Sequence, residues 1–165
     1  MRVLGIDPGT QAMGYGLVDY QDDKLGMLDC GVLTPPSHTP IVERLFILYE
    51  GLKEILARWE PDEVAIEEPF VAKNVRSALA VGRAQAVAML AATSKGIPVY
   101  TYTPTQVRRM VADYGASDKE QVQRMVRLQL DLAQIPPSDA ADALAVAICH
   151  LWESRTGRLL AKEGK

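Results

Sequence analysis

Four acidic residues stand at positions where a scaffold presents side chains to a pocket. Asp7 and Glu67 each end an apolar run. Asp139 and Asp142 interrupt the alanine-rich stretch 138–148. Carboxylates gathered in one place repel one another, which raises their pKa values. A bound divalent cation relieves that repulsion, and oxygen ligands suit Mg²⁺. The residue types therefore indicate a metal-dependent site for phosphodiester chemistry.

Each of these residues, taken alone, also has a plainer interpretation. Asp7 could begin an Asp-Pro-Gly turn. Glu67 could be a strand-end charge that reaches solvent, and the pattern alone does not separate it from Glu68. Asp139, in the first turn of a helix, could interact with the helix dipole. Asp142 is harder to explain, because its alanine neighbours predict a half-buried position where an unpaired charge is costly.

The elements that must position these residues follow from hydrophobic periodicity and from breakers. We expect strands at 2–7, 15–18, 25–33, 64–67 and 97–102, and helices at 42–56, 77–94, 104–113, 118–130 and 139–155. The first three strands read as antiparallel. A crossover helix then returns the strand at 64–67 parallel to the first strand and beside it. This order predicts an α/β fold, a mixed five-stranded sheet flanked by helices.

This topology makes the carboxylates converge. Asp7 and Glu67 lie side by side at one edge of the expected sheet. Ser138 is expected to cap the last helix, and Asp139 and Asp142 lie three residues apart on one face of it. The alanines of that helix allow it to approach the strand ends closely.

Length and composition bound the class of protein. A chain of 165 residues, 48% apolar and 24% charged, is typical of one globular domain. We expect residues 1–155 to form that domain and residues 156–165 to be a flexible polar tail. The first strand begins too early for a signal peptide, and no apolar run reaches the roughly 18 residues that cross a bilayer. Two cysteines without metal-ligand spacing fit a reducing cytosol, so we expect a cytoplasmic protein.

Charge is distributed unevenly along the chain. The net charge is −3, but residues 73–127 hold 9 Lys and Arg against 3 acids, and residues 1–72 hold 5 against 13. A basic block inside an acidic protein suits a surface that follows nucleic-acid phosphates. The same charges could instead be solvated helix faces.

Several motifs together closely resemble the RuvC family of crossover (Holliday) junction endodeoxyribonucleases. The resemblance covers about residues 2–152, and its motifs are Gly5-Ile-Asp-Pro-Gly-Thr10, Gly14-Tyr-Gly16, Ala65-Ile-Glu67, Phe70-Val-Ala-Lys-Asn74 and Asp139-Ala-Ala-Asp-Ala-Leu-Ala145. It implies a ribonuclease-H-like fold and a homodimer. It also implies metal-dependent, symmetric nicking of two like-polarity strands of a four-way DNA junction in recombination and repair. The expected ends are a 5′-phosphate and a 3′-hydroxyl.

By this resemblance, Asp7, Glu67, Asp139 and Asp142 match the catalytic, metal-binding positions of the family, which favours Glu67 over Glu68. We expect two Mg²⁺ ions, replaceable by Mn²⁺, with Asp7 as the bridging ligand because it lies centrally between the other segments. No nucleophilic side chain is needed, and His150 is expected to be structural.

The resemblance further implies DNA-binding positions. Phe70 matches an aromatic residue that wedges between bases, and Lys73, Asn74, Arg108 and Lys119 match positions that face DNA. The small-residue helix at 77–94 matches the family's dimer interface, although Gly82-Arg-Ala-Gln-Ala86 departs from the common Gly-Gln-Ala-Arg-Gly. A branch-migration motor of the RuvA and RuvB type is the expected protein partner.

Three other functions compete with this interpretation. A ribonuclease-H-like nuclease for RNA processing shares the Asp-x-Gly start but generally lacks the Phe70 loop together with Asp-Ala-Ala-Asp-Ala. A sugar-kinase or actin-type ATPase needs two such domains, for which 165 residues are too few. A catalytically weak module that only binds junctions would be expected to lose at least one of the four carboxylates.

Overall fold

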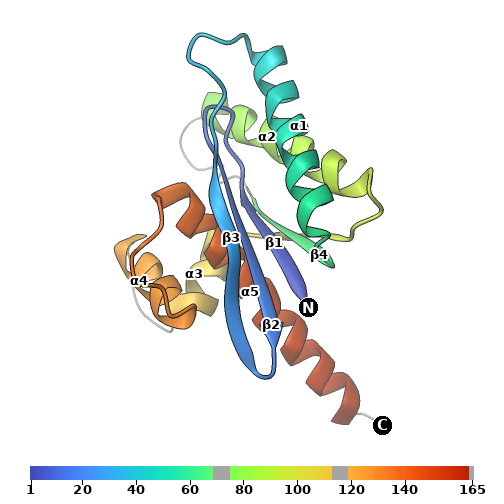
Figure 1. Ribbon diagram of the computed structural model, residues 1–165, viewed down its shortest axis with the longest axis vertical. Coiled ribbons are helices and arrows are strands. Elements are labelled where there is room, and N and C mark those ends of the chain that lie inside the picture. The colour runs from blue at the N-terminus through green and yellow to red at the C-terminus, as the bar shows by residue number, and fades with distance from the viewer. Residues whose placement is uncertain (69–74, 113–118, 164–165) are drawn as a thin grey trace.

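The chain folds around a single five-stranded sheet (Figure 1). The computed structural model describes residues 1–68, 75–112 and 119–163. The elements within these ranges, in chain order, are β1 (Arg2–Asp7), β2 (Met13–Gln21), β3 (Lys24–Leu33), α1 (Ile41–Trp59), β4 (Glu63–Glu67), α2 (Val75–Thr93), β5 (Val99–Tyr102), α3 (Pro104–Ala112), α4 (Lys119–Gln129) and α5 (Ser138–Glu163).

The sheet has the predicted mixed topology, with strand order β3-β2-β1-β4-β5. Strands β1, β2 and β3 are antiparallel neighbours, whereas β4 is parallel to both β1 and β5. In the β1–β4 ladder, Ile6 is the partner of Ile66. The next residue on each strand is a carboxylate, so Asp7 and Glu67 lie side by side at the carboxyl edge of the sheet, as the crossover rule predicts.

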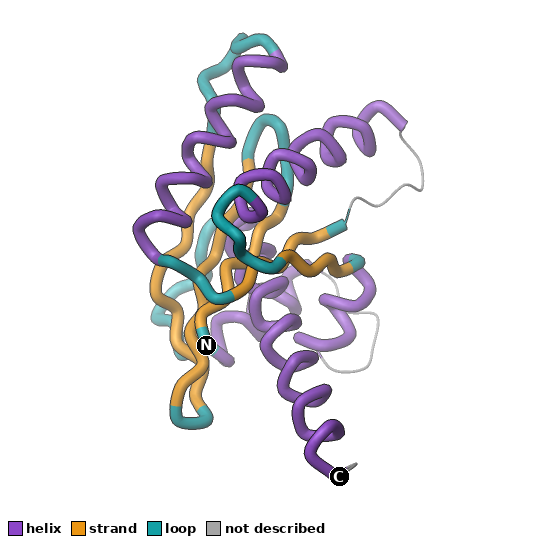
Figure 2. The backbone as a smooth tube through the Cα atoms, turned by 90° about the vertical axis from the view of Figure 1, so that its right-hand side faces the viewer, coloured by secondary structure: helices purple, strands orange, loops and turns teal. Residues whose placement is uncertain are grey.

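Alternation along the strands divides the core into two layers. Leu4 and Ile6 of β1 pack with buried residues of α1 and α2 on one face. Val3 of β1 and Ala65 of β4 pack with α3, α4 and α5 on the other face. Figures 1 and 2 show the two groups of helices on opposite sides of the strands. By the same alternation, Asp7 and Glu67 belong to the face that α5 covers.

Helix α5 lies unusually close to the sheet because the strands present glycines to it. A Cβ atom added at Gly5 would lie 2.0 Å from the carbonyl oxygen of Ala143, and one added at Gly14 would lie 2.0 Å from that of Asp139. Real Cβ atoms do not approach so closely, so a side chain at either position would push the helix away. The glycines thus bring the backbone of α5, and the carboxylates it carries, down to the strand ends.

Two expectations about α5 are wrong. The helix continues to Glu163, past the end predicted near residue 155. Arg155 pairs with Asp23 at 3.3 Å and lies over the rings of Tyr20 and Trp152, which anchors this helical stretch to the β2–β3 hairpin. Ser138 is not the cap either, because the amide of Ala141 already donates to the carbonyl of the residue before Ser138, at 2.9 Å.

Among the helices in the described ranges, none is long and apolar enough to cross a membrane.

Candidate active site

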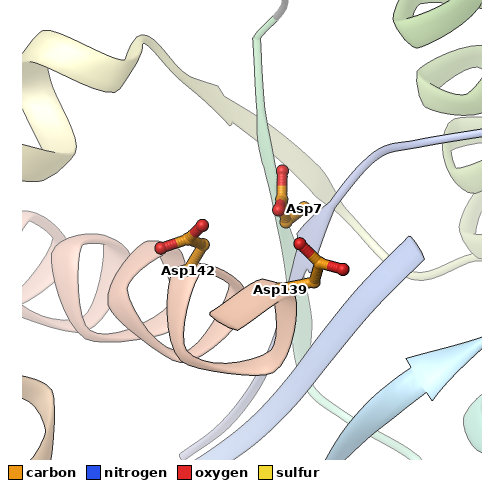
Figure 3. A group of neighbouring side chains, drawn as sticks. All are labelled: Asp7, Asp139 and Asp142. Carbon is orange, nitrogen blue, oxygen red and sulfur yellow. The ribbon is translucent and has the colours of Figure 1, made fainter. Parts of the chain in front are cut away.

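Three carboxylates from the two ends of the chain meet at the carboxyl edge of the sheet. Asp7 ends β1, and Asp139 and Asp142 lie on the first turns of α5. One carboxylate oxygen of each lies within 4.8 Å of the others (Figure 3). All three residues are partly buried. This spacing lets one or two cations share the three carboxylates, and the glycine contacts described above are what make it possible.

Glu67 completes the group through a side-chain hydrogen bond with Asp7. Burial, then the charges of Asp7 and Asp142, raise the pKa of Glu67 to about 8. Burial, then the charges of Asp142 and Asp139, raise the pKa of Asp7 to about 6. The two carboxyl groups therefore share a proton near neutral pH, with Glu67 as its donor. A divalent cation that binds these two carboxyl groups would displace the shared proton.

Two positively charged side chains, Lys119 and Arg108, lie beside the carboxylates. The ammonium of Lys119 lies 2.6 Å from Oδ2 of Asp142, and this contact raises the pKa of the lysine. Arg108 donates from Nε to the carbonyl of Pro104 at 3.2 Å, and its charge lowers the pKa of Glu67 against the larger effect of burial. Both residues line a pocket of about 260 Å³ whose walls also include Glu67 and Asp142. The pocket thus combines acids that suit a metal with bases that suit a phosphate.

The neighbouring carboxylate, Glu68, is engaged elsewhere. Its Oε1 accepts a hydrogen bond from Oγ1 of Thr101 on β5, at 2.8 Å. Since successive residues of a strand point to opposite faces, only Glu67 can face the α5 carboxylates. The geometry therefore favours Glu67 over Glu68 as the fourth carboxylate of the group, a choice that periodicity alone left open.

The structure brings together six of the nine residues predicted for the site: Asp7, Glu67, Asp139, Asp142, Arg108 and Lys119. The remaining three, Phe70, Lys73 and Asn74, lie outside the described residues. Sequence reasoning missed Gly5 and Gly14, which set the height of α5 above the sheet. Their signal was available, because both are glycines within apolar strands, where glycine is otherwise unfavourable.

The donor set suits a hard divalent cation. Four carboxyl groups offer oxygen ligands only, which favours Mg²⁺ or Mn²⁺ over metals that prefer nitrogen or sulfur. Within the described part of the chain, His150 and Cys149 lie further along α5 in the buried core and are not in this group.

Comparison with known proteins identifies the family. The family described as "Crossover junction endodeoxyribonuclease RuvC" matches residues 3–150. The chain belongs to the RuvC family. Curated RuvC relatives include one from Dehalococcoides mccartyi strain 195, 54% identical over 151 residues, which cover 91% of this chain and 92% of the relative. Another, from Chloroflexus aggregans, is 54% identical over 157 residues, or 94% of this chain and 96% of the relative.

Solved structures agree with this membership. RuvC of T. thermophilus in complex with a Holliday junction substrate superposes with a TM-score of 0.89 and 38% identity, covering 95% of this chain and 96% of that one. The yeast mitochondrial Holliday junction resolvase Ydc2 shares only the fold, with a TM-score of 0.66 at 15% identity. This RuvC family member therefore has the predicted ribonuclease-H-like architecture, and it carries a cluster of carboxylates that suits a divalent metal.

Proposed function

We propose that the protein resolves Holliday junctions by Mg²⁺-dependent, symmetric nicking of two strands of like polarity. The observation that carries this proposal is the meeting of four carboxylates from β1, β4 and α5 beside Arg108 and Lys119. Membership of the RuvC family, whose T. thermophilus member is seen with a junction, supports the choice of substrate. We take residues 1–155 as the single nuclease domain.

Within this proposal, Asp7, Glu67, Asp139 and Asp142 hold the metal ions. When bound by these carboxylates, Mg²⁺ would supply an activated water molecule and stabilise negative charge on the leaving oxygen, and Mn²⁺ would substitute for it. Asp7 serves both neighbouring segments, because it lies between Glu67 and the two α5 carboxylates. Glu67 must give up the proton it shares with Asp7 before it can act as an anionic ligand. Proton and metal therefore compete for the same pair of oxygens.

The basic residues bind and orient the DNA. Lys119 is near enough to Asp142 to hold a phosphate at the edge of the carboxylate group, and Arg108 lines the same pocket. Water adds to the scissile phosphorus and the bond to the 3′ oxygen breaks, which leaves a 5′-phosphate and a 3′-hydroxyl. Phe70, Lys73 and Asn74, by resemblance, contact the bases and phosphates near the crossover.

A homodimer is supported by the exposed apolar face of α2. Val75, Leu79 and Leu90 are 73%, 57% and 65% exposed. Beside them lies a hollow of about 490 Å³ with a mostly apolar lining that includes Ala78 and Gly82. Single exposed apolar residues are ordinary, but a contiguous patch of them marks an interface. A two-fold dimer would set two identical sites on a junction that is itself nearly two-fold.

The proposal also includes a cellular location and a protein partner. The substrate is chromosomal DNA, so we place the protein in the cytoplasm. We also propose a branch-migration motor of the RuvA and RuvB type as its partner.

The test is cleavage of an end-labelled four-way junction in Mg²⁺, beside a linear duplex of the same sequence. We expect paired nicks, resealable by a ligase, on the junction alone. Asp7→Asn should abolish them, and the matched change Asp22→Asn, on the exposed β2–β3 turn, should not. Tight junction binding without nicks, across several junction sequences and with Mn²⁺ tried, would favour a junction-binding module. Cleavage of structured RNA but not of junctions would favour the RNA-processing nuclease.

A further inference from the structure

A second cluster of polar groups joins the amino end of β4 to the middle of α5, away from the carboxylates. His150 of α5 is only 2% exposed. Its Nε2 lies 2.5 Å from Oε2 of Glu63 on β4, and its Nδ1 lies 2.6 Å from the hydroxyl of Tyr102 on β5. One imidazole ring thus connects three elements of the fold. We call Glu63, His150 and Tyr102 the His150 clasp.

Further contacts fix the ring of His150. The Tyr102 hydroxyl also forms a side-chain hydrogen bond with Glu153, which together with burial raises the tyrosine pKa. The ring of Tyr100 lies against the imidazole, with centroids 4.5 Å apart. Both ring nitrogens are therefore engaged and one ring face is covered. Such a buried polar network is directional, and it holds its members in one arrangement more strictly than apolar packing does.

The contact between His150 and Glu63 lies along the same two elements as the carboxylates, β4 and α5. Glu63 and Glu67 are four residues apart on β4, or about 13 Å at the rise of a strand. Asp142 and His150 are eight residues apart on α5, or about 12 Å at the rise of a helix. The distance from Glu63 to Glu67 along β4 is thus nearly equal to the distance from His150 back to Asp142 along α5. A contact between His150 and Glu63 therefore places Asp142 beside Glu67. Tyr102 strengthens the connection, because it is the direct β5 partner of Glu67.

Apolar packing supplies most of the contact between α5 and the sheet, and apolar packing is not directional. Ala143, Ala145 and Ala147 are fully buried but have only a methyl group each. Leu144 fits against Gly16 of β2, and the clasp adds a directional contact from α5 to β4. Catalytic groups must be held within about 0.5 Å of their productive positions. A displacement of about 1 Å can lower a rate about 100-fold.

We propose that the His150 clasp is a positioning element for the metal site: it holds the α5 carboxylates in register with Glu67. The clasp residues are not among the proposed metal ligands or DNA-binding residues, so they would act through Asp142 and Glu67. The inference rests on the proposed function, because it takes those two carboxylates to be metal ligands. It assigns a role to His150 that differs from filling the core.

The test uses metal affinity, which is measured without DNA. Mn²⁺ binding to the full-length protein is followed by calorimetry for Tyr102→Phe, which removes one hydroxyl, and for Glu63→Ala and Glu63→Gln. We expect Tyr102→Phe and Glu63→Ala to weaken Mn²⁺ binding about tenfold, as is usual when support behind a ligand is lost. Glu63→Gln keeps an oxygen that can accept from Nε2 and should recover part of the affinity. The Mg²⁺ concentration for half-maximal junction cleavage should shift in parallel.

The matched control is Trp152→Phe. This change removes a hydrogen bond from another residue of α5, the 3.1 Å contact between Trp152 Nε1 and Gln129 Oε1, which joins α5 to α4 instead of to the sheet. Thermal unfolding in EDTA gives the loss of stability for each variant. Mn²⁺ affinity that falls in the clasp variants, but not in a control of equal stability loss, supports the proposal.

Two outcomes are distinguishable failures. Clasp variants that are destabilised like the control, yet bind Mn²⁺ with wild-type affinity, would overturn the positioning role while leaving the nuclease proposal intact. A wild-type protein that binds Mn²⁺ but cleaves no junction would instead contradict the proposed function, and the Mn²⁺ series would still decide the role of the clasp.

Discussion

Helices α2 and α5 are both rich in alanine and cover opposite faces of the same sheet, yet they are buried to different degrees. In α5, every residue from Ala140 to Leu151 is buried except Asp142. In α2, the buried residues are four alanines, Ala84, Ala88, Ala91 and Ala92, at helical spacing. The rest of α2 presents apolar side chains such as Leu79 to solvent.

The difference shows two uses of small side chains. On α5 they allow backbone contact with strand glycines, and this contact brings three carboxylates together. On α2 they allow one stripe to pack on the sheet while the opposite stripe stays available for a second subunit. The α5 face therefore holds the proposed metal site, and the α2 face holds the proposed dimer interface. Variants on the two faces should consequently fail in different assays.

The largest effect is expected on the α5 face from Glu67→Gln. Losing one anionic ligand should remove several kcal/mol of transition-state stabilisation, or about 10³-fold in single-turnover cleavage. The same change removes a buried, mutually repelled carboxyl group, so the metal-free protein should unfold at a higher temperature at about pH 8. The control is Glu68→Gln, outside the site. Equal loss of cleavage in both variants would contradict the assignment of Glu67.

Gly14→Ala tests the close approach of α5. The new Cβ atom would lie 2.0 Å from the carbonyl oxygen of Asp139, so the helix start must move. We expect a loss of about 1–3 kcal/mol in urea unfolding, as for overpacking, together with weaker Mn²⁺ binding. Gly26→Ala is the matched change, because nothing lies within 4 Å of its Cβ position. If Gly14→Ala were as benign as Gly26→Ala, the glycines would not set the height of α5.

The free energy of unfolding should depend on pH because of the carboxyl groups that face α5. The pKa of Glu67 is about 8 in the folded protein, above its ordinary 4.5, so the folded state binds more protons than the unfolded state between these values. Stability in EDTA should therefore fall as pH rises through this window. Saturating Mg²⁺ should raise the melting temperature by several degrees, and by more at about pH 8 than at about pH 5. A Mg²⁺ effect that is larger at the lower pH would contradict the shared proton.

The smallest effect on stability is expected on the α2 face. Leu79→Glu changes a side chain that is 57% exposed, so unfolding of a monomer should shift by about 0.5 kcal/mol or less. The change should nevertheless dissociate the dimer, as measured by sedimentation equilibrium. Leu128→Glu is the control, because Leu128 is 69% exposed on α4, on the other face. Dissociation by both variants, or by neither, would contradict an interface on α2.

The topology and the central carboxylates could be predicted from the sequence because they follow from local rules. Apolar runs located β1 and β4, and the handedness of crossovers then placed Asp7 beside Glu67. The three-residue spacing of Asp139 and Asp142 placed both on one side of α5. None of this required knowing a contact between distant side chains. The predicted roles of these residues, and of the DNA-binding residues, remain predictions that the experiments above test.

Features that depend on distant contacts escaped prediction. The stretch of α5 around residue 155 contacts the first hairpin, because Arg155 meets Tyr20 and Asp23 there. His150 reads as a core residue in its own helix, and its partner Glu63 lies 87 positions away. Periodicity reports which face of an element is buried. Periodicity does not identify the polar group on the neighbouring element that a buried side chain will contact.

The position of α5 after all five strands has a consequence for how the site is assembled during synthesis. During synthesis the strands and α1 leave the ribosome well before residues 138–163, so one face of the sheet is complete while the other lacks its cover. Domains generally fold as units once their sequence is available. Asp139 and Asp142 lie on α5, so Asp7 and Glu67 have no partners from this helix until its first turns have been made. A chain that stalls before residue 138 therefore lacks two of the four proposed metal ligands.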